Sequence, residues 1–250
     1  MTHDSTQNPQ LAVILEAIQN HDYPDSIEQI KAYVAELEAH ERFYPASQLL
    51  SHTRERYQSI RQFQTETAQG KWWQSDTAQD EVWITQKQAF FTYKNPELPP
   101  RTRFNDTLLL LEEIGLRDAT NCNAETLALG GAAYKRKWQH FGQLEDLIEA
   151  LFFYRAAFER NPKQDKGYGG VNAAFILDLL ADRAKQIARR SGIKFNESEA
   201  SNFSDQAAAL RQKMTLQIPT WQVEIELLPE SDRFWPQITI AEIYFGLRQY

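Results

Sequence analysis

The chain has 250 residues and carries 27 Lys or Arg side chains against 34 Asp or Glu, so its formal net charge is −7. That acidic balance argues against a DNA-binding protein, which needs a basic face to neutralise phosphates. The single cysteine excludes an internal disulfide framework, and no apolar run is long enough to cross a bilayer. We therefore expect a cytoplasmic protein that binds neither DNA nor a membrane.

Apolar residues at helical spacing mark the first half of the chain. Those between Leu11 and Ile18 fall at i, i+3, i+4 and i+7, which predicts an amphipathic helix. Ser26 is placed to cap a second helix that runs through Leu37. Further helices are expected at about 45–63, 80–93 and 101–115, with a loop at 67–75 that contains Trp72-Trp73.

The second half of the chain is also predicted to be helical. We expect helices at about 124–139, 143–160, 170–191, 203–215 and 233–247. Only 221–227 alternates apolar and polar residues as a strand does. An isolated strand would have no partner, so we interpret this segment as an extended connection or a short hairpin edge. The predicted fold class is all-α.

A tetratricopeptide repeat is recognisable between residues 127 and 162. This repeat is a helix–turn–helix of about 34 residues, in which small residues let the two helices approach closely. The interval between Gly131 and Ala150 is longer than in the repeat, so we expect an extended turn at about 137–146. Weaker pairs at 26–57, 80–115 and 170–215, and an isolated first helix at 240–250, predict a solenoid of antiparallel helix pairs. The matching positions are Gly131, Tyr134, Ala150, Tyr154, Ala157 and Pro162.

The segment 123–138, NAETLALGGAAYKRKW, resembles the central motif of the prokaryotic TPR-S (tetratricopeptide repeat, sensor) family. A similar motif occurs in the TRAF-binding central regulatory region of the apoptosis signal-regulating kinases. Segments 154–162 and 167–174 also match, and the resemblance covers about residues 26–250. It implies a helical repeat module that is fused to, or encoded beside, a caspase-like protease or TIR effector in bacterial defence. It further implies that the module senses a nucleotide- or NAD-derived signal. We predict no cofactor.

Charged residues and glycines are unevenly distributed along the chain. Residues 1–124 have 11 basic and 18 acidic side chains, residues 125–194 have 12 and 8, and residues 195–250 have 4 and 8. Six of the ten glycines lie between 130 and 170. We therefore divide the chain into acidic N-terminal helical pairs (1–124) and a TPR-S core (125–250) with a basic, glycine-rich centre and an incomplete final repeat. Such a centre suits an anionic ligand, although composition alone favours turns and a solvated helix face.

Two segments supply the candidate ligand-binding residues. On a helix, at most two of the three basic residues at 135–137 can face one groove. The segment 167–170 contains three glycines and directly precedes a helix. Exposed backbone N–H groups there would suit a phosphate. The alternative is a tight linker between repeats. For Gly130-Gly131 the alternative to a ligand role is close helix packing. The candidates that we expect around one concavity are Lys135, Arg136, Trp138, Tyr154, Tyr168, Gly169, Gly170 and Asn172.

Catalytic and metal-binding patterns are weak. The five histidines lack the spacing of a zinc site, and no histidine is close in sequence to Cys122. We therefore predict no catalytic residue, no metal and no enzyme. The expected function is a sensor module that binds a small anionic signal and controls an effector, and the alternative is a plain scaffold that binds a peptide or effector protein.

The last helix carries an apolar strip of four residues. If it is the first helix of a repeat, its second helix is missing, and the strip needs cover. We expect the natural protein to continue beyond residue 250, through at least one more helix. The alternative is cover by a partner chain or by a second copy in a homo-oligomer. The strip consists of Ile240, Ile243, Tyr244 and Leu247.

Overall fold

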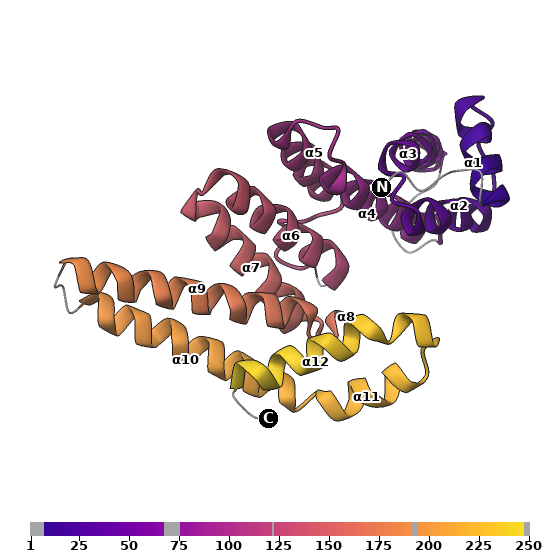
Figure 1. The fold of residues 1–250 in the computed structure, drawn as a ribbon. Helices are drawn as coiled ribbons and strands as arrows, with labels where there is room; N and C mark the ends of the chain where they lie inside the picture. Colours follow the sequence, from indigo (N-terminus) through magenta and orange to yellow (C-terminus); the bar gives the residue numbers. More distant parts are fainter. Residues whose placement is uncertain (1–7, 68–75, 122, 192–194, 248–250) are drawn as a thin grey trace. The chain divides into compact units, whose positions relative to one another are not determined.

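A computed structural model describes residues 8–67, 76–121, 123–191 and 195–247, which form helices joined by short connections (Figure 1). The expectations for Trp72-Trp73 and for Cys122 concern residues that lie outside these ranges. Contacts divide the chain into two compact units, Met1–Ile114 and Gly115–Tyr250. The boundary between these units therefore lies ten residues before position 124, where the change in net charge predicted a domain boundary.

The described residues of the first unit form five helices, and side-chain caps begin the first two of them. The Asn8 side chain accepts hydrogen bonds from the backbone N–H groups of Gln10 and Leu11, and Ser26 accepts one from that of Gln29. The predicted helices all form, and the third is longer at both ends than expected. The five are α1 (Pro9–Gln19), α2 (Ile27–Ala39), α3 (Phe43–Thr67), α4 (Asp76–Lys94) and α5 (Pro100–Glu113).

The second unit is built from antiparallel helix pairs. In this unit α6 packs along α7, α9 packs along α10, and α7 also contacts α9, so that consecutive pairs stack as in a tetratricopeptide-like repeat (Figure 1). Burial of one face of each pair against the next explains why the pairs occur together. The elements are α6 (Ala124–Phe141), α7 (Leu144–Arg160), α8 (Pro162–Asp165), α9 (Tyr168–Ser191), α10 (Phe195–Thr215), α11 (Ile218–Glu226), the 3-10 turn η3 (Glu230–Asp232) and α12 (Phe234–Leu247).

The connection between α6 and α7 corrects one prediction. We expected an extended turn at about 137–146, but only Gly142 and Gln143 separate the two helices. Gly142 adopts φ 73° and its N–H donates to the Trp138 carbonyl at 2.7 Å, which ends α6 abruptly. The extra residues of this repeat therefore lengthen its helices and leave the turn short. An ion pair of 3.0 Å between Lys137 and Asp146 joins the two helices near this turn.

Two adjacent glycines of α6 provide close packing. A Cβ atom on Gly131 would lie 2.7 Å from Cγ of the buried Tyr154 ring in α7. A Cβ atom on Gly130 would lie 2.5 Å from a methyl carbon of Leu116. The glycines thus occupy the small-residue positions of the repeat, which offsets a helix-propensity cost of roughly 1 kcal/mol each.

Residues 221–226 are helical and Leu227 caps the helix, so the prediction of an extended connection or a short hairpin edge was wrong. Trp221 and Ile225 are buried on one face of α11, whereas Val223 and Leu227 are 61% and 82% exposed. Burial therefore follows a spacing of four residues and not of two. Pro219, in the first turn of α11, is compatible with this helix start.

The strip on α12 is covered only in part. Ile243 is buried, Ile240 and Leu247 are half-buried, and Tyr244 is 37% exposed. The helix also exposes Trp235 and other large apolar side chains. An apolar surface of this helix therefore remains open in the isolated chain.

Candidate functional site

Two of the predicted ligand-binding residues meet where α6 contacts α9. The Lys135 ammonium donates a hydrogen bond of 2.8 Å to Oδ1 of Asn172. Asn172 lies in the first turns of α9, and its Nδ2 donates to the Tyr168 carbonyl at 2.9 Å. This second bond orients the amide so that its oxygen faces Lys135. The contact therefore joins the first helices of two successive repeats.

Lys135 is a half-buried cation that lacks a paired carboxylate among the residues described. Its Nζ lies 5.0 Å from the centroid of the Phe175 ring, a cation–π contact. Burial lowers the pKa of Lys135, Arg136 lowers it further, and Glu242 of α12 acts in the opposite direction. The ammonium is thus balanced by an amide oxygen, a ring and a more distant carboxylate, and an additional anion would stabilise its charged form.

Arg136 lies next to this cation and faces solvent. Its guanidinium makes a long contact of 3.4 Å with Oε1 of Gln139 and no ion pair within the described ranges. The neighbouring Tyr168 packs edge-on against Tyr154, with ring centroids 6.0 Å apart. Burial raises the pKa of Tyr168, whereas the hydrogen bond from Tyr154 and the charge of Arg136 lower it. Contacts thus join Lys135 to Asn172, Asn172 to Tyr168 and Tyr168 to Tyr154. We call these four residues, together with Arg136, the α6–α9 site.

At the glycine-rich start of α9, the backbone N–H groups already bind a carboxylate of the chain itself. The Asp165 carboxylate accepts hydrogen bonds from the backbone N–H of Gly169 at 2.8 Å and from that of Gly170 at 3.3 Å. Burial raises the pKa of Asp165 to about 6, although the N–H groups of Gly167, Gly169 and Gly170 all act to lower it. The donors that we expected to serve a phosphate are thus engaged by this side chain.

Packing also explains why these positions are glycines. A Cβ atom on Gly169 would lie 2.5 Å from the Tyr154 carbonyl oxygen, and one on Gly170 would overlap Sδ of Met214. Both glycines therefore allow α9 to approach its neighbours. Their contact with a ligand stays a prediction.

The comparisons with known proteins agree with the repeat packing. The family model Tetratricopeptide Repeats-Sensor matches residues 53–177, which is half of the chain. The chain belongs to the Tetratricopeptide Repeats-Sensor family. No curated protein and no solved structure matches it. As a member of this family, it is a TPR-like regulatory or interaction module.

The family match includes the α6–α9 site but not every residue around it. Lys135, Tyr168 and Asn172 lie within 53–177, whereas Glu242 lies beyond it. No described helix of this Tetratricopeptide Repeats-Sensor chain is long and apolar enough to cross a membrane. In the described part of the chain, no group of three or more His, Cys, Asp or Glu residues could hold a metal ion.

Trp138, another predicted site residue, is half-buried on α6, three residues after Lys135. It lies four residues after Tyr134, which stacks on Phe153 of α7 with ring centroids 5.6 Å apart. The role of Trp138 in ligand binding stays a prediction.

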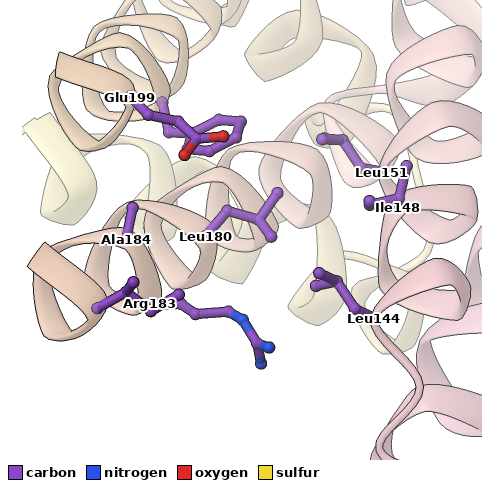
Figure 2. Close-up of a pocket in the computed structure, with 9 residues that line it drawn as sticks. Leu144, Ile148, Leu151, Leu180, Arg183, Ala184 and Glu199 are labelled. Atoms are coloured by element: carbon purple, nitrogen blue, oxygen red, sulfur yellow. The ribbon is translucent and has the colours of Figure 1, made fainter. Parts of the chain in front are cut away.

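Sequence reasoning missed three features of this unit. The acid that caps α9, Asp165, precedes the glycines by only a few residues, a spacing that could have indicated an internal cap. Phe175, whose ring contacts Lys135, lies one helical turn after Asn172, so helical spacing could have placed it at the same site. The third feature is a pocket formed by α7, α9 and α10 (Figure 2), which no single segment of sequence indicates.

Proposed function

We propose that this chain is a non-enzymatic sensor that binds a small anionic ligand at the α6–α9 site and thereby controls a fused or partner effector. The proposed ligand is nucleotide- or NAD-derived, and the proposed effector is a caspase-like protease or a TIR domain in bacterial defence. Both identities come from the resemblance of segment 123–138 to sensor proteins. The coarser role, a regulatory or interaction module, follows from the family itself.

The observation that carries the proposal is the environment of Lys135. A half-buried ammonium that is hydrogen-bonded to a neutral amide loses part of its hydration without gaining a full opposite charge. A phosphate or carboxylate beside it would restore that balance, and the exposed Arg136 would add a second charge-assisted hydrogen bond. The half-exposed rings of Tyr168 and Phe175 offer apolar surfaces on which a base could stack.

A thermal-shift and calorimetry screen against ATP, ADP, NAD and cyclic ADP-ribose isomers tests the proposal. A ligand at 100 times its Kd should stabilise the fold by about 2.7 kcal/mol. Lys135→Met keeps the apolar stem and removes the charge, so the ligand found in the screen should bind about 10- to 100-fold more weakly. Arg136→Ala should abolish binding while leaving the Tm nearly unchanged, because Arg136 is exposed.

Lys185→Met is the matched control, because Lys185 is an exposed lysine of α9 that pairs with Asp182 at 3.5 Å. The same loss of charge there should leave the affinity within about twofold. The proposal fails if none of these compounds changes the Tm. It also fails if Lys135→Met and Lys185→Met weaken binding equally, since that would indicate general charge attraction.

A protein-binding scaffold is the second candidate, and the exposed apolar side chains of α12 favour it. Trp235 is 74% exposed, and Phe245 is also exposed on the same helix. A scaffold would use such side chains for a partner protein and would tolerate Lys135→Met. Substituting Trp235 and Phe245 by Ser should therefore weaken effector binding but not anion binding.

A further inference from the structure

A second groove lies on α7, α9 and α10, and the proposed sensor function does not involve it. Leu144, Ile148 and Leu151 of α7 form one wall, and Phe203 of α10 contributes to the other. Figure 2 shows the α7 side chains facing Leu180 across the groove. The remaining lining residues are Ala184, Ile187, Arg183 and Glu199.

The groove has room for an apolar group. Its volume is about 270 Å³, and Ile148 on its wall is 50% exposed although its surroundings are apolar. An engineered apolar cavity of about 150 Å³ holds one benzene ring. By the same ratio this groove accommodates about ten carbon atoms. At one side, a hydrogen bond of 3.1 Å between Arg155 and Gln206 joins α7 to α10.

Charge at the edge of the groove favours an acidic group at one place. The Arg183 side chain extends towards Leu144, with its guanidinium between α9 and α7 (Figure 2). Arg183 is exposed and has no ion-pair partner in the described part of the chain. Glu199 lies on the opposite side, on α10, and is also exposed. An anion is therefore attracted to the Leu144 side and repelled from the α10 side.

We propose that this groove binds a small apolar acid, namely an alkyl or aryl carboxylate of about ten carbon atoms. Its apolar part lies against Ile148, Leu151 and Leu180, and its carboxylate contacts the Arg183 guanidinium. The opposite orientation would place two carboxylates together at Glu199. The groove is thus a ligand site separate from Lys135 and Asn172.

Octanoate and its neutral analogue 1-octanol are the probes for this site. Titrations of the full chain, followed by two-dimensional amide NMR, should perturb α7, α9 and α10 with either probe. Octanoate should bind more tightly than 1-octanol. Arg183→Gln should weaken octanoate binding about 3- to 5-fold, as expected for an exposed ion pair, and leave 1-octanol unchanged. Glu199→Gln should strengthen octanoate binding.

Two further variants keep the test specific. Arg189→Gln changes the same charge on an exposed residue of the same helix and should have no effect. Ile148→Glu places a carboxylate on the wall and should abolish binding of both probes, with circular dichroism confirming the fold. The proposal is overturned if neither probe binds, if the perturbed amides lie elsewhere, or if Arg183→Gln and Arg189→Gln weaken octanoate equally.

Discussion

Gly167 is the residue whose substitution tests the packing of the second unit most directly. It adopts φ +86°, and a Cβ atom there would lie 2.9 Å from Cζ3 of the buried Trp221 ring and 3.2 Å from Cγ2 of Thr239. Gly142 has a similar φ of +73° but nothing within 4 Å of the position a Cβ atom would occupy. Replacing each glycine by alanine therefore separates backbone strain from packing.

The two substitutions should differ by the packing cost. An L-residue in the left-handed region costs about 1–2 kcal/mol, which applies to both positions. Forcing a methyl group into a well-packed core costs about 1–3 kcal/mol more, which applies only at Gly167. We therefore expect Gly167→Ala to lower the free energy of unfolding by about 2–5 kcal/mol and Gly142→Ala by about 1–2 kcal/mol.

Guanidinium unfolding followed by circular dichroism measures both changes, and any second transition is fitted separately because the chain has two units. Trp221→Phe removes the ring atoms nearest Gly167, so in that background Gly167→Ala should cost less, which a double-mutant cycle detects. Equal costs for Gly167→Ala and Gly142→Ala, or no coupling to position 221, would refute the reasoning.

The remaining predictions concern a buried acid and two tryptophans. Because the pKa of Asp165 is raised from 3.8 to about 6, the folded chain binds this proton more tightly than the unfolded chain. The protonated carboxyl thus adds about 3 kcal/mol to the free energy of unfolding below pH 3.8, and this stabilisation is lost as the pH rises through 6. In unfolding experiments, Asp165→Asn should flatten the dependence of stability on pH. Parallel pH profiles for the variant and the unmodified chain would contradict this. Trp221→Ala should cost about 3–5 kcal/mol, because Trp221 is 1% exposed. Trp235→Ala should lower the free energy of unfolding by less than about 0.5 kcal/mol, because Trp235 is exposed. Similar losses in Tm for Trp221→Ala and Trp235→Ala would contradict the burial of Trp221.

Helix positions could be predicted because their signals are local. Ser26 was predicted to cap a helix, and its side chain does accept a hydrogen bond from the backbone N–H of Gln29. Alternation at 221–227 was misleading because Trp221 and Ile225, four residues apart, also share one face of a helix, and only packing distinguishes a helix from a strand here. Burial of Trp221 beneath Gly167 is such a packing fact.

The candidate site could be predicted only in part. Lys135 and Asn172 were expected to converge because their helices belong to successive repeats, and their side chains do meet. The glycine entry was expected to offer its N–H groups to a ligand, yet Asp165 accepts hydrogen bonds from them. A loop's donors can be counted from sequence, but whether they are already used depends on three-dimensional contacts.

The sequence by itself determined the all-helical fold, the tetratricopeptide-like pairing and the family, because helix periodicity, caps and small-residue positions act over a few residues. Only the tertiary structure decided which charges are paired and which are open. Lys137 meets Asp146 across a turn, whereas Arg183, beside a groove, has no ion-pair partner among the described residues. These outcomes depend on how separate helices approach one another, and burial and electrostatic balance are properties of that approach and not of any one segment.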